Sequence, residues 1–195
     1  MPDQSKVLVT RDLIFYYKVS ASGNALPADT VEWGTAWSTW TDGGYTQGGL
    51  GFNAEISRGE VRMDQSLDPV ARPATGRTVT MTANLGEFDL ASLVTATGQG
   101  SVSTTAPSSG VRGHTDWTMG QTVADNYYSV AFDILHQGDD EAVRVAGWHT
   151  QPTGAQQWTF GPENAALTPF VVSLFPDPNG SGRVATIRDI IEAAA

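Results

Sequence analysis

The strictest pattern in this sequence of 195 residues is the run RTVTMTANL, from Arg77 to Leu85. Apolar residues occupy every second position from Val79 onward, and threonine or asparagine occupies the positions between them. Side chains of a β-strand point alternately to its two faces, so this run predicts a strand with one buried face and one polar face.

Seven further segments have the alternation, or the β-branched and aromatic content, of strands. They are residues 13–19, 52–56, 126–136, 142–149, 158–160, 169–175 and 183–191. The apolar phase slips by one position after Gly59, which predicts a bulge or a tight hairpin at that glycine. The chain also holds 21 Gly and 10 Pro, the turn formers that β-rich domains use.

A short helix is predicted directly after the strand that ends at Leu85. Leu90, Leu93 and Val94 recur at helical spacing and should form the face of the helix that packs on the core, and Gly98 is a suitable end. Eight strands and one helix predict a mainly β fold, a β-sandwich or barrel with one short helix on one side.

The length fits a single domain over residues 1–195. Within it we expect an N-terminal arm over about residues 1–12. Two segments rich in Gly, Ser and Thr, at about 20–50 and 99–123, predict flexible loops.

The formal net charge is −10, from 21 acidic and 11 basic residues, and the basic residues are scattered singly along the sequence. Binding to nucleic acid requires clustered Lys and Arg, so this composition argues against it. The chain has no Cys, which excludes disulfides and Cys-ligated metals. No apolar run has the length of a signal peptide or of a membrane span, so we expect a soluble protein that is not secreted and does not associate with a membrane.

Motifs of catalysis or metal binding are weak. His114, His136 and His149 have no nucleophile motif beside them. Residues 177–182, DPNGSG, match the first half of a calcium loop, but Arg188 stands where the bidentate acid is needed, and an ordinary turn explains the same residues. Acids suited to glycoside hydrolysis have no supporting spacing. We therefore expect no enzyme activity, no metal and no cofactor.

Trp33, Trp37 and Trp40 lie close together in a segment rich in Gly, Thr and Ser. Aromatic rings on a β-sandwich can stack on sugars, which makes a carbohydrate-binding module one reading of this cluster. Tryptophans also concentrate in subunit interfaces and in cores, and the interface is the reading that we favour.

Three stretches carry a resemblance to a known family. The first contains VRMDQ, then Pro69-Val70, a strand after Gly76, and the helix entry L-x-E-x-x-L that begins at Leu85. The others are GGYTQGGLGFNAEI before it and TPFVVSLFPDPNGSGRVATIRD near the C-terminus. In this order they resemble segments of the major tail, or tail tube, proteins of long-tailed bacteriophages, over about half of the chain.

The resemblance implies a virion structural protein that self-assembles. Six β-sandwich-like copies with a flanking helix would close into a ring, and rings would stack into a tube through which DNA passes without specific binding. The implied partners are other copies of the chain and the tape-measure, distal-tail and tail-terminator proteins. The implied location is the phage tail, with assembly in the host cytoplasm. A carbohydrate-binding β-sandwich, or another tail or head component, remains the alternative.

The resemblance also suggests roles for single residues. The acids expected to face the lumen of the tube are Glu55, Glu60 and Asp64; alternatively, they face bulk solvent. Contacts between subunits or rings are expected from the N-terminal arm around Val7 to Phe15 and from the following segment, at Val7, Phe15, Trp37, Trp40 and Tyr45; the alternative is ordinary core packing.

Overall fold

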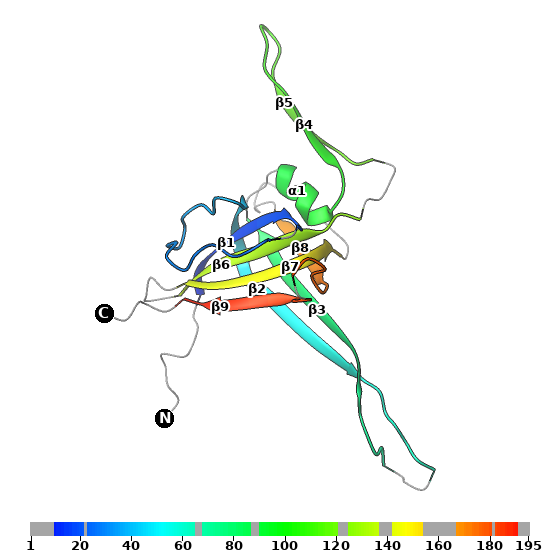
Figure 1. The fold of residues 1–195 in the computed structure, drawn as a ribbon. Coiled ribbons are helices and arrows are strands. Elements are labelled where there is room, and N and C mark those ends of the chain that lie inside the picture. Colours follow the sequence, from blue (N-terminus) through cyan, green and yellow to red (C-terminus); the bar gives the residue numbers. More distant parts are fainter. Residues whose placement is uncertain are drawn as a thin grey trace, which may run out of the picture.

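The computed structural model describes residues 10–21, 23–64, 68–86, 90–120, 125–136, 142–153, 167–180 and 182–190. These residues form nine strands and one helix. In chain order they are β1 (Thr10–Val19), β2 (Thr41–Arg58), β3 (Ala74–Leu85), α1 (Leu90–Thr97), β4 (Ser101–Thr105), β5 (His114–Thr118), β6 (Tyr128–His136), β7 (Ala142–Pro152), β8 (Thr168–Leu174) and β9 (Ala185–Asp189). The mainly β fold predicted from the sequence is confirmed (Figure 1).

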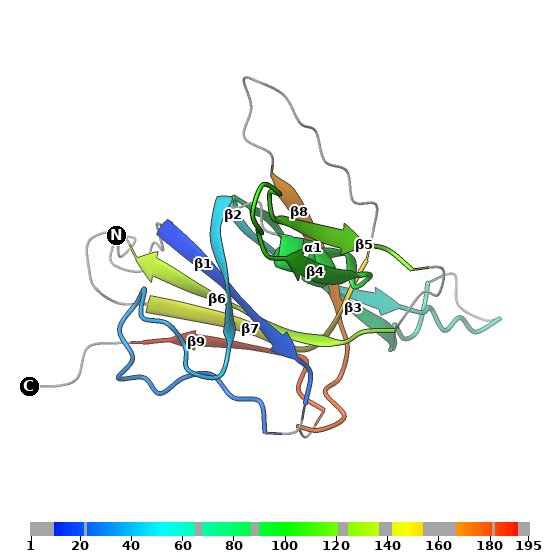
Figure 2. The same ribbon diagram turned by 90° about the horizontal axis from the view of Figure 1, so that it is seen from above.

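The large sheet closes on itself. Its strands follow the order β6-β1-β2-β3-β8-β7-β9, and β6 also pairs with β7, so that the first and sixth strands meet. Every pairing in it is antiparallel. One edge of β7 is shared: residues 143–147 pair with β9 and residues 150–152 pair with β8. The result is a barrel-like sheet with β9 attached beside the closure (Figures 1 and 2).

The interior of the barrel is filled by apolar side chains from alternate positions of its strands. Phe15 lies at the centre, fully buried, with its ring 5.3 Å from Phe132 and 4.7 Å from Phe170. The helix α1 contributes Ala96 to this core, and Leu93 is also buried. The cluster consists of Leu13, Phe15, Val79, Met81, Ala83, Leu85, Ala96, Val130, Phe132, Ile134, Val145, Phe170, Val172, Leu174 and Val184.

The outer face of β1, β6 and β7 is also buried, because the segment of residues 20–40, here called the strap, covers it. Trp37 stacks on Tyr16 of β1 at 4.2 Å, and Trp40 contacts Trp37 edge to face at 5.6 Å. The indole N–H of Trp40 donates to the carbonyl of Ala25 at 3.1 Å. This second apolar cluster contains Ile14, Tyr16, Leu26, Trp37, Trp40, Ala131, Ala146 and Trp148.

A buried ion pair holds the strap against the barrel. Arg144 of β7 donates from Nε to Oδ1 of Asp133 on β6 at 3.2 Å, and both side chains have no exposed surface. The same guanidinium donates to the backbone carbonyls of Ala28, at 3.1 Å, and Val31 in the strap. Burial raises the pKa of the Asp133 carboxyl, while Arg144 acts in the opposite direction. One arginine therefore joins β6, β7 and the strap.

Two hairpins project from the barrel in different directions (Figure 1). The long arm, defined as residues 51–78, is made of the distal parts of β2 and β3 and their connection. Its described residues up to Thr78 are almost all exposed. The short arm, residues 101–118, is the separate two-stranded sheet β4-β5 beside α1. In both projecting hairpins each strand pairs with its partner strand but makes little contact with the barrel core.

Several predicted boundaries need correction. A flexible loop over residues 20–50 is wrong, because residues 41–50 belong to β2 and the strap buries Leu26, Trp37 and Trp40. The predicted loop over 99–123 contains the short arm, although residues 121–124 lie outside the described ones. Residues 10–12 of the predicted N-terminal arm belong to β1, and residues 1–9 are outside the description.

The predicted irregularity at Gly59 is displaced. Ser57 pairs with Gly76 and Arg58 pairs with Ala74, so the extra residue is Thr75 on the partner strand β3. The backbone N–H of Gly59 bonds to the carbonyl of Pro73 at 3.0 Å, which continues the hairpin rather than turning it. The predicted strand at 158–160 lies outside the described residues. Within the described part of the chain, no helix has the length and apolar content needed to cross a membrane.

The strap should depend on Arg144. We expect Arg144→Met to lower the free energy of unfolding by about 3 to 5 kcal/mol, because it leaves the buried Asp133 carboxylate without its partner. Arg188→Met is the matched control: Arg188 pairs with Asp29 at 2.7 Å on the surface, where such pairs contribute about 1 kcal/mol or less. Urea unfolding of both variants measures the difference. Equal losses of unfolding free energy would contradict the role of Arg144 in holding the strap against the barrel.

Tyr16 should make the fold sensitive to alkaline pH. Its pKa is raised from 10.0 to about 12, first because burial disfavours the phenolate and then because Asp42 and Asp133 lie near. Between pH 10 and about pH 12 the Tyr16 hydroxyl loses its proton in the unfolded chain and keeps it in the folded chain. The free energy of unfolding then falls by up to about 1.4 kcal/mol per pH unit. Urea unfolding from pH 9.5 to 11.5 should show a steeper fall for the wild type than for Tyr16→Phe, and parallel curves would contradict the shift.

Candidate functional site

The outer face of β2, β3 and β8 is the part of the barrel that the strap leaves open, and it is polar. Directly paired residues point to the same side of a sheet. Asn53 pairs with Thr80 and Glu55 pairs with Thr78, while Thr80 pairs on its other side with Ser173 of β8. This polar face consists of Gly51, Asn53, Glu55, Ser57, Thr78, Thr80, Thr82, Asn84 and Ser173, with Pro169 and Val171 of β8 as its apolar members. Glu55 is its single charged residue.

A pair of glycines shapes the upper end of the polar face. Gln47 pairs with Asn84 and Leu50 pairs with Ala83, so Gly48 and Gly49 have no partners on β3. Both glycines have positive φ, at 84° and 83°, which is strained for other residues. The bulge bends β2 where it passes from its pairing with β1 to the long arm.

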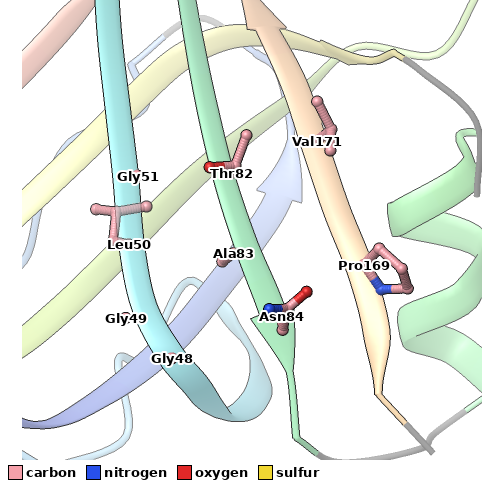
Figure 3. Close-up of a pocket in the computed structure, with 9 residues that line it drawn as sticks. All are labelled: Gly48, Gly49, Leu50, Gly51, Thr82, Ala83, Asn84, Pro169 and Val171. Atoms are coloured by element: carbon pink, nitrogen blue, oxygen red, sulfur yellow. The ribbon is translucent and has the colours of Figure 1, made fainter.

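The bend leaves a depression of about 350 Å³ on the polar face (Figure 3). Its lining comes from β2, β3 and β8 and contains small, uncharged residues. The lining residues are Gly48, Gly49, Leu50, Gly51, Thr82, Ala83, Asn84, Pro169 and Val171. Such a lining offers few groups for tight binding of a charged ligand.

The opposite face of the long arm is apolar and exposed. Phe52 pairs with the fully buried Met81, so this face continues the inner face of the barrel. Beyond the barrel, however, Phe52 is 40% exposed and Ile56 is 53% exposed. Arg77, which pairs with Ile56, also lies on this side. We call Phe52, Ala54, Ile56, Arg58 and Arg77 the apolar face of the long arm.

Charge is unevenly divided between the long arm and the rest of the chain. Residues 51–78 contain four acids and four arginines, so the net charge of −10 lies entirely outside the arm. Near the end of the arm, Glu60 binds Arg62 at 2.9 Å and Arg72 at 3.0 Å. The guanidinium of Arg58 donates to the backbone carbonyl of Arg72 at 3.3 Å.

The three acids predicted to face a lumen all lie on the long arm. Glu55 is on the polar face, whereas Glu60 and Asp64 lie beyond the end of β2, in the connection to β3. All three are exposed. The two arginines bound to Glu60 offset its charge, so Glu55 is the acid that the polar face presents. Their position relative to a lumen stays a prediction.

The residues predicted to make contacts between subunits differ in their exposure. Phe15, Trp37 and Trp40 are 0%, 3% and 8% exposed, because the first fills the barrel and the other two pack beneath the strap. For these three the core-packing reading describes the structure, and the contact reading needs correction. Tyr45 of β2 is 51% exposed, and its contact role stays a prediction. Val7 lies outside the described residues.

The described residues contain no group of three His, Asp, Glu or Cys side chains that could hold a metal ion. His149 stacks on Tyr127 at 4.1 Å, and its Nδ1 lies 2.9 Å from the hydroxyl of Ser20. In the former calcium-loop candidate, Oδ1 of Asp177 accepts from the N–H of Asn179 at 2.9 Å, as in an ordinary turn.

The carbohydrate-binding reading relied on exposed tryptophans. Trp37, Trp40 and Trp148 are buried, and Trp33 and Trp117 are half-buried. Trp33 donates to the backbone carbonyl of Asp133 at 3.4 Å, within the strap contact. All five are buried or half-buried, so the Trp cluster does not support that reading.

No family model matches the chain, and no curated protein matches its sequence.

Sequence reasoning missed the gathering of arginines. The basic residues are isolated in sequence, yet Arg58, Arg62, Arg72 and Arg77 come together because β2 and β3 pair along the long arm. The antiparallel register of residues 52–58 with 74–81 was the signal that could have found them. It also would have shown that the apolar positions of 52–56 lie beyond the barrel.

The apolar face should contribute little to the stability of the monomer. We expect Phe52→Ala and Ile56→Ala each to cost about 1 kcal/mol or less, as at partly exposed sites. Met81→Ala, on the same face but inside the barrel, should cost about 2 to 5 kcal/mol. Chemical denaturation of dilute protein measures all three, and a loss at Phe52 as large as that at Met81 would show that the arm is part of the core.

Proposed function

We propose that this chain is a virion structural protein of the tail tube type, which self-assembles into rings that stack into a tube. The observation that carries the proposal is the two-faced sheet of β2 and β3. One face is polar with a single charge, and the opposite face, apolar within the barrel, continues outward as the exposed apolar face of the long arm.

The polar face has the properties that the wall of a DNA conduit needs. Hydroxyl and amide side chains keep the surface wetted, while the absence of Lys and Arg among its residues leaves no cationic group to hold phosphates. Glu55 adds a negative charge, which repels the DNA backbone. A wall of this kind lets DNA slide past without specific recognition.

The apolar face has the properties of a contact between copies. Large contiguous apolar patches are rare on monomeric proteins and mark interaction sites. The long arm also extends well away from the barrel (Figure 1), so it can reach a neighbouring molecule. A two-stranded hairpin alone is marginal in water, and packing against a neighbour would stabilise it.

Assembly is tested by negative-stain electron microscopy and sedimentation across a concentration series. We expect the wild type to form hollow rings or tubes of uniform diameter. Phe52→Asp/Ile56→Asp should stay monomeric and folded, because carboxylates would replace the apolar side chains that the contact buries. Asn53→Asp/Ser57→Asp is the matched control, since it adds the same charge to the polar face of the same strand and should still assemble.

Two outcomes would overturn the proposal. A wild type that stays monomeric at high concentration is not a self-assembling tube protein. Assembly that survives Phe52→Asp/Ile56→Asp but is lost in Asn53→Asp/Ser57→Asp would place the contact on the polar face, and that face could not then line a channel.

A further inference from the structure

The apolar face of the long arm carries two arginines that lack a carboxylate partner among the described residues. Glu60 pairs with both Arg62 and Arg72, whereas Arg58 and Arg77 form no ion pair with any carboxylate of the described residues. Arg58 lies two positions beyond Ile56 on β2, and Arg77 is directly opposite Ile56 on β3. The two guanidinium groups therefore flank an exposed isoleucine. A surface that receives this face needs to be apolar and acidic.

The strap offers exposed acids and exposed small apolar side chains. Residues 20–40 contain Asp29 and Glu32 and no Lys, Arg or His. Both acids are exposed, and Asp29 is already paired with Arg188 of β9 at 2.7 Å, so it would have to bind a second guanidinium, as Glu60 does in the long arm. The alanines at positions 25, 28 and 36 are also exposed, so the strap presents small apolar side chains as well as acids. The inner side of the strap is fixed by Arg144, so this outer surface is held in one shape.

The two surfaces lie on opposite sides of the molecule. In both Figure 1 and Figure 2 the long arm extends to the right of the barrel, while the strap lies on its left. A contact between them would thus join two copies head to tail. Such a heterologous contact leaves one arm and one strap free at the ends, so it propagates into a closed ring or a filament.

We propose that the strap of a second copy of this chain receives the apolar face of the long arm, with Arg58 and Arg77 placed against Asp29 and Glu32. This inference rests on the proposed function and names the partner surface within it. Phe52 and Ile56 pack on the alanines of the strap, and the charges set the register of the contact. Charge complementarity of this kind mainly selects partners and orientation.

Two charge-reversed variants test the contact. The arm variant is Arg58→Glu/Arg77→Glu and the strap variant is Asp29→Lys/Glu32→Lys. In each variant alone, like charges meet at every contact, so the concentration needed for assembly should rise by about tenfold or more. In an equimolar mixture each arm can find a strap of opposite charge, in strict alternation. The mixture should assemble near the wild-type concentration, as measured by sedimentation and electron microscopy.

Arg62→Gln/Arg112→Gln, compared with Arg58→Gln/Arg77→Gln, controls for the loss of two positive charges elsewhere on the surface. The variant at Arg62 and Arg112 should assemble at the wild-type concentration. The variant at Arg58 and Arg77 should need a higher concentration. Circular dichroism and thermal unfolding confirm that every variant is folded. The loss of the exposed Asp29–Arg188 pair in the strap variant should change the stability little.

The outcomes separate the two proposals. Rescue by mixing supports the contact of arm and strap. If the wild type assembles but the folded variants assemble equally well alone, or fail to recover when mixed, the contact is wrong and the tube proposal stands. If the wild type does not assemble, the tube proposal itself fails.

Discussion

The arrangement of exposed surfaces in this protein depends on the guanidinium of Arg144. Placing a charged pair where neither side chain has any exposed surface carries a large desolvation cost, which good geometry and additional hydrogen bonds must offset. Here the additional bonds go to the backbone carbonyls of Ala28 and Val31, so the bonds that offset the burial also fasten the strap. The strap in turn covers the apolar outer face of β1, β6 and β7. What remains open is the polar face of β2, β3 and β8, together with the arms.

The strands β2 and β3 use one alternating pattern in two environments. Inside the barrel, Val79 and Met81 are buried on the inner face; along the arm, Phe52 and Ile56 continue that face into solvent. An exposed apolar row invites association, and the net charge of −10 on the rest of the chain keeps dilute copies apart through long-range repulsion. The arginines of the arm then make its contact with an acidic surface selective. Association is favoured at one surface and disfavoured elsewhere.

Sequence patterns succeeded where burial is decided locally. The alternation of residues 77–85 predicted β3, the paired runs at 126–136 and 142–149 predicted the β6–β7 hairpin, and helical spacing predicted α1. The strap was missed because its three-dimensional partners are distant in sequence: Trp37 packs on Tyr16 and beside Arg144. The short arm was missed because SVSTT and HTDWT are exposed on both faces and therefore show no apolar period. Within the candidate site, the sequence pointed to the acids of the long arm but not to the grouping of its four arginines.

The sequence by itself determined the class of fold, the main strands and the acidity of the chain, because strand alternation and charge are properties of neighbouring residues or of simple sums. Only the tertiary structure decided which apolar residues are core and which are surface. Phe15 and Phe52 look alike in sequence, each an aromatic residue in a strand, yet one is fully buried and the other is 40% exposed. The difference arises because the barrel closes around β1 through contacts between β1, β6 and β7, whereas β2 runs past the point of closure. Where a sheet closes depends on pairings between distant strands, and no local pattern records them.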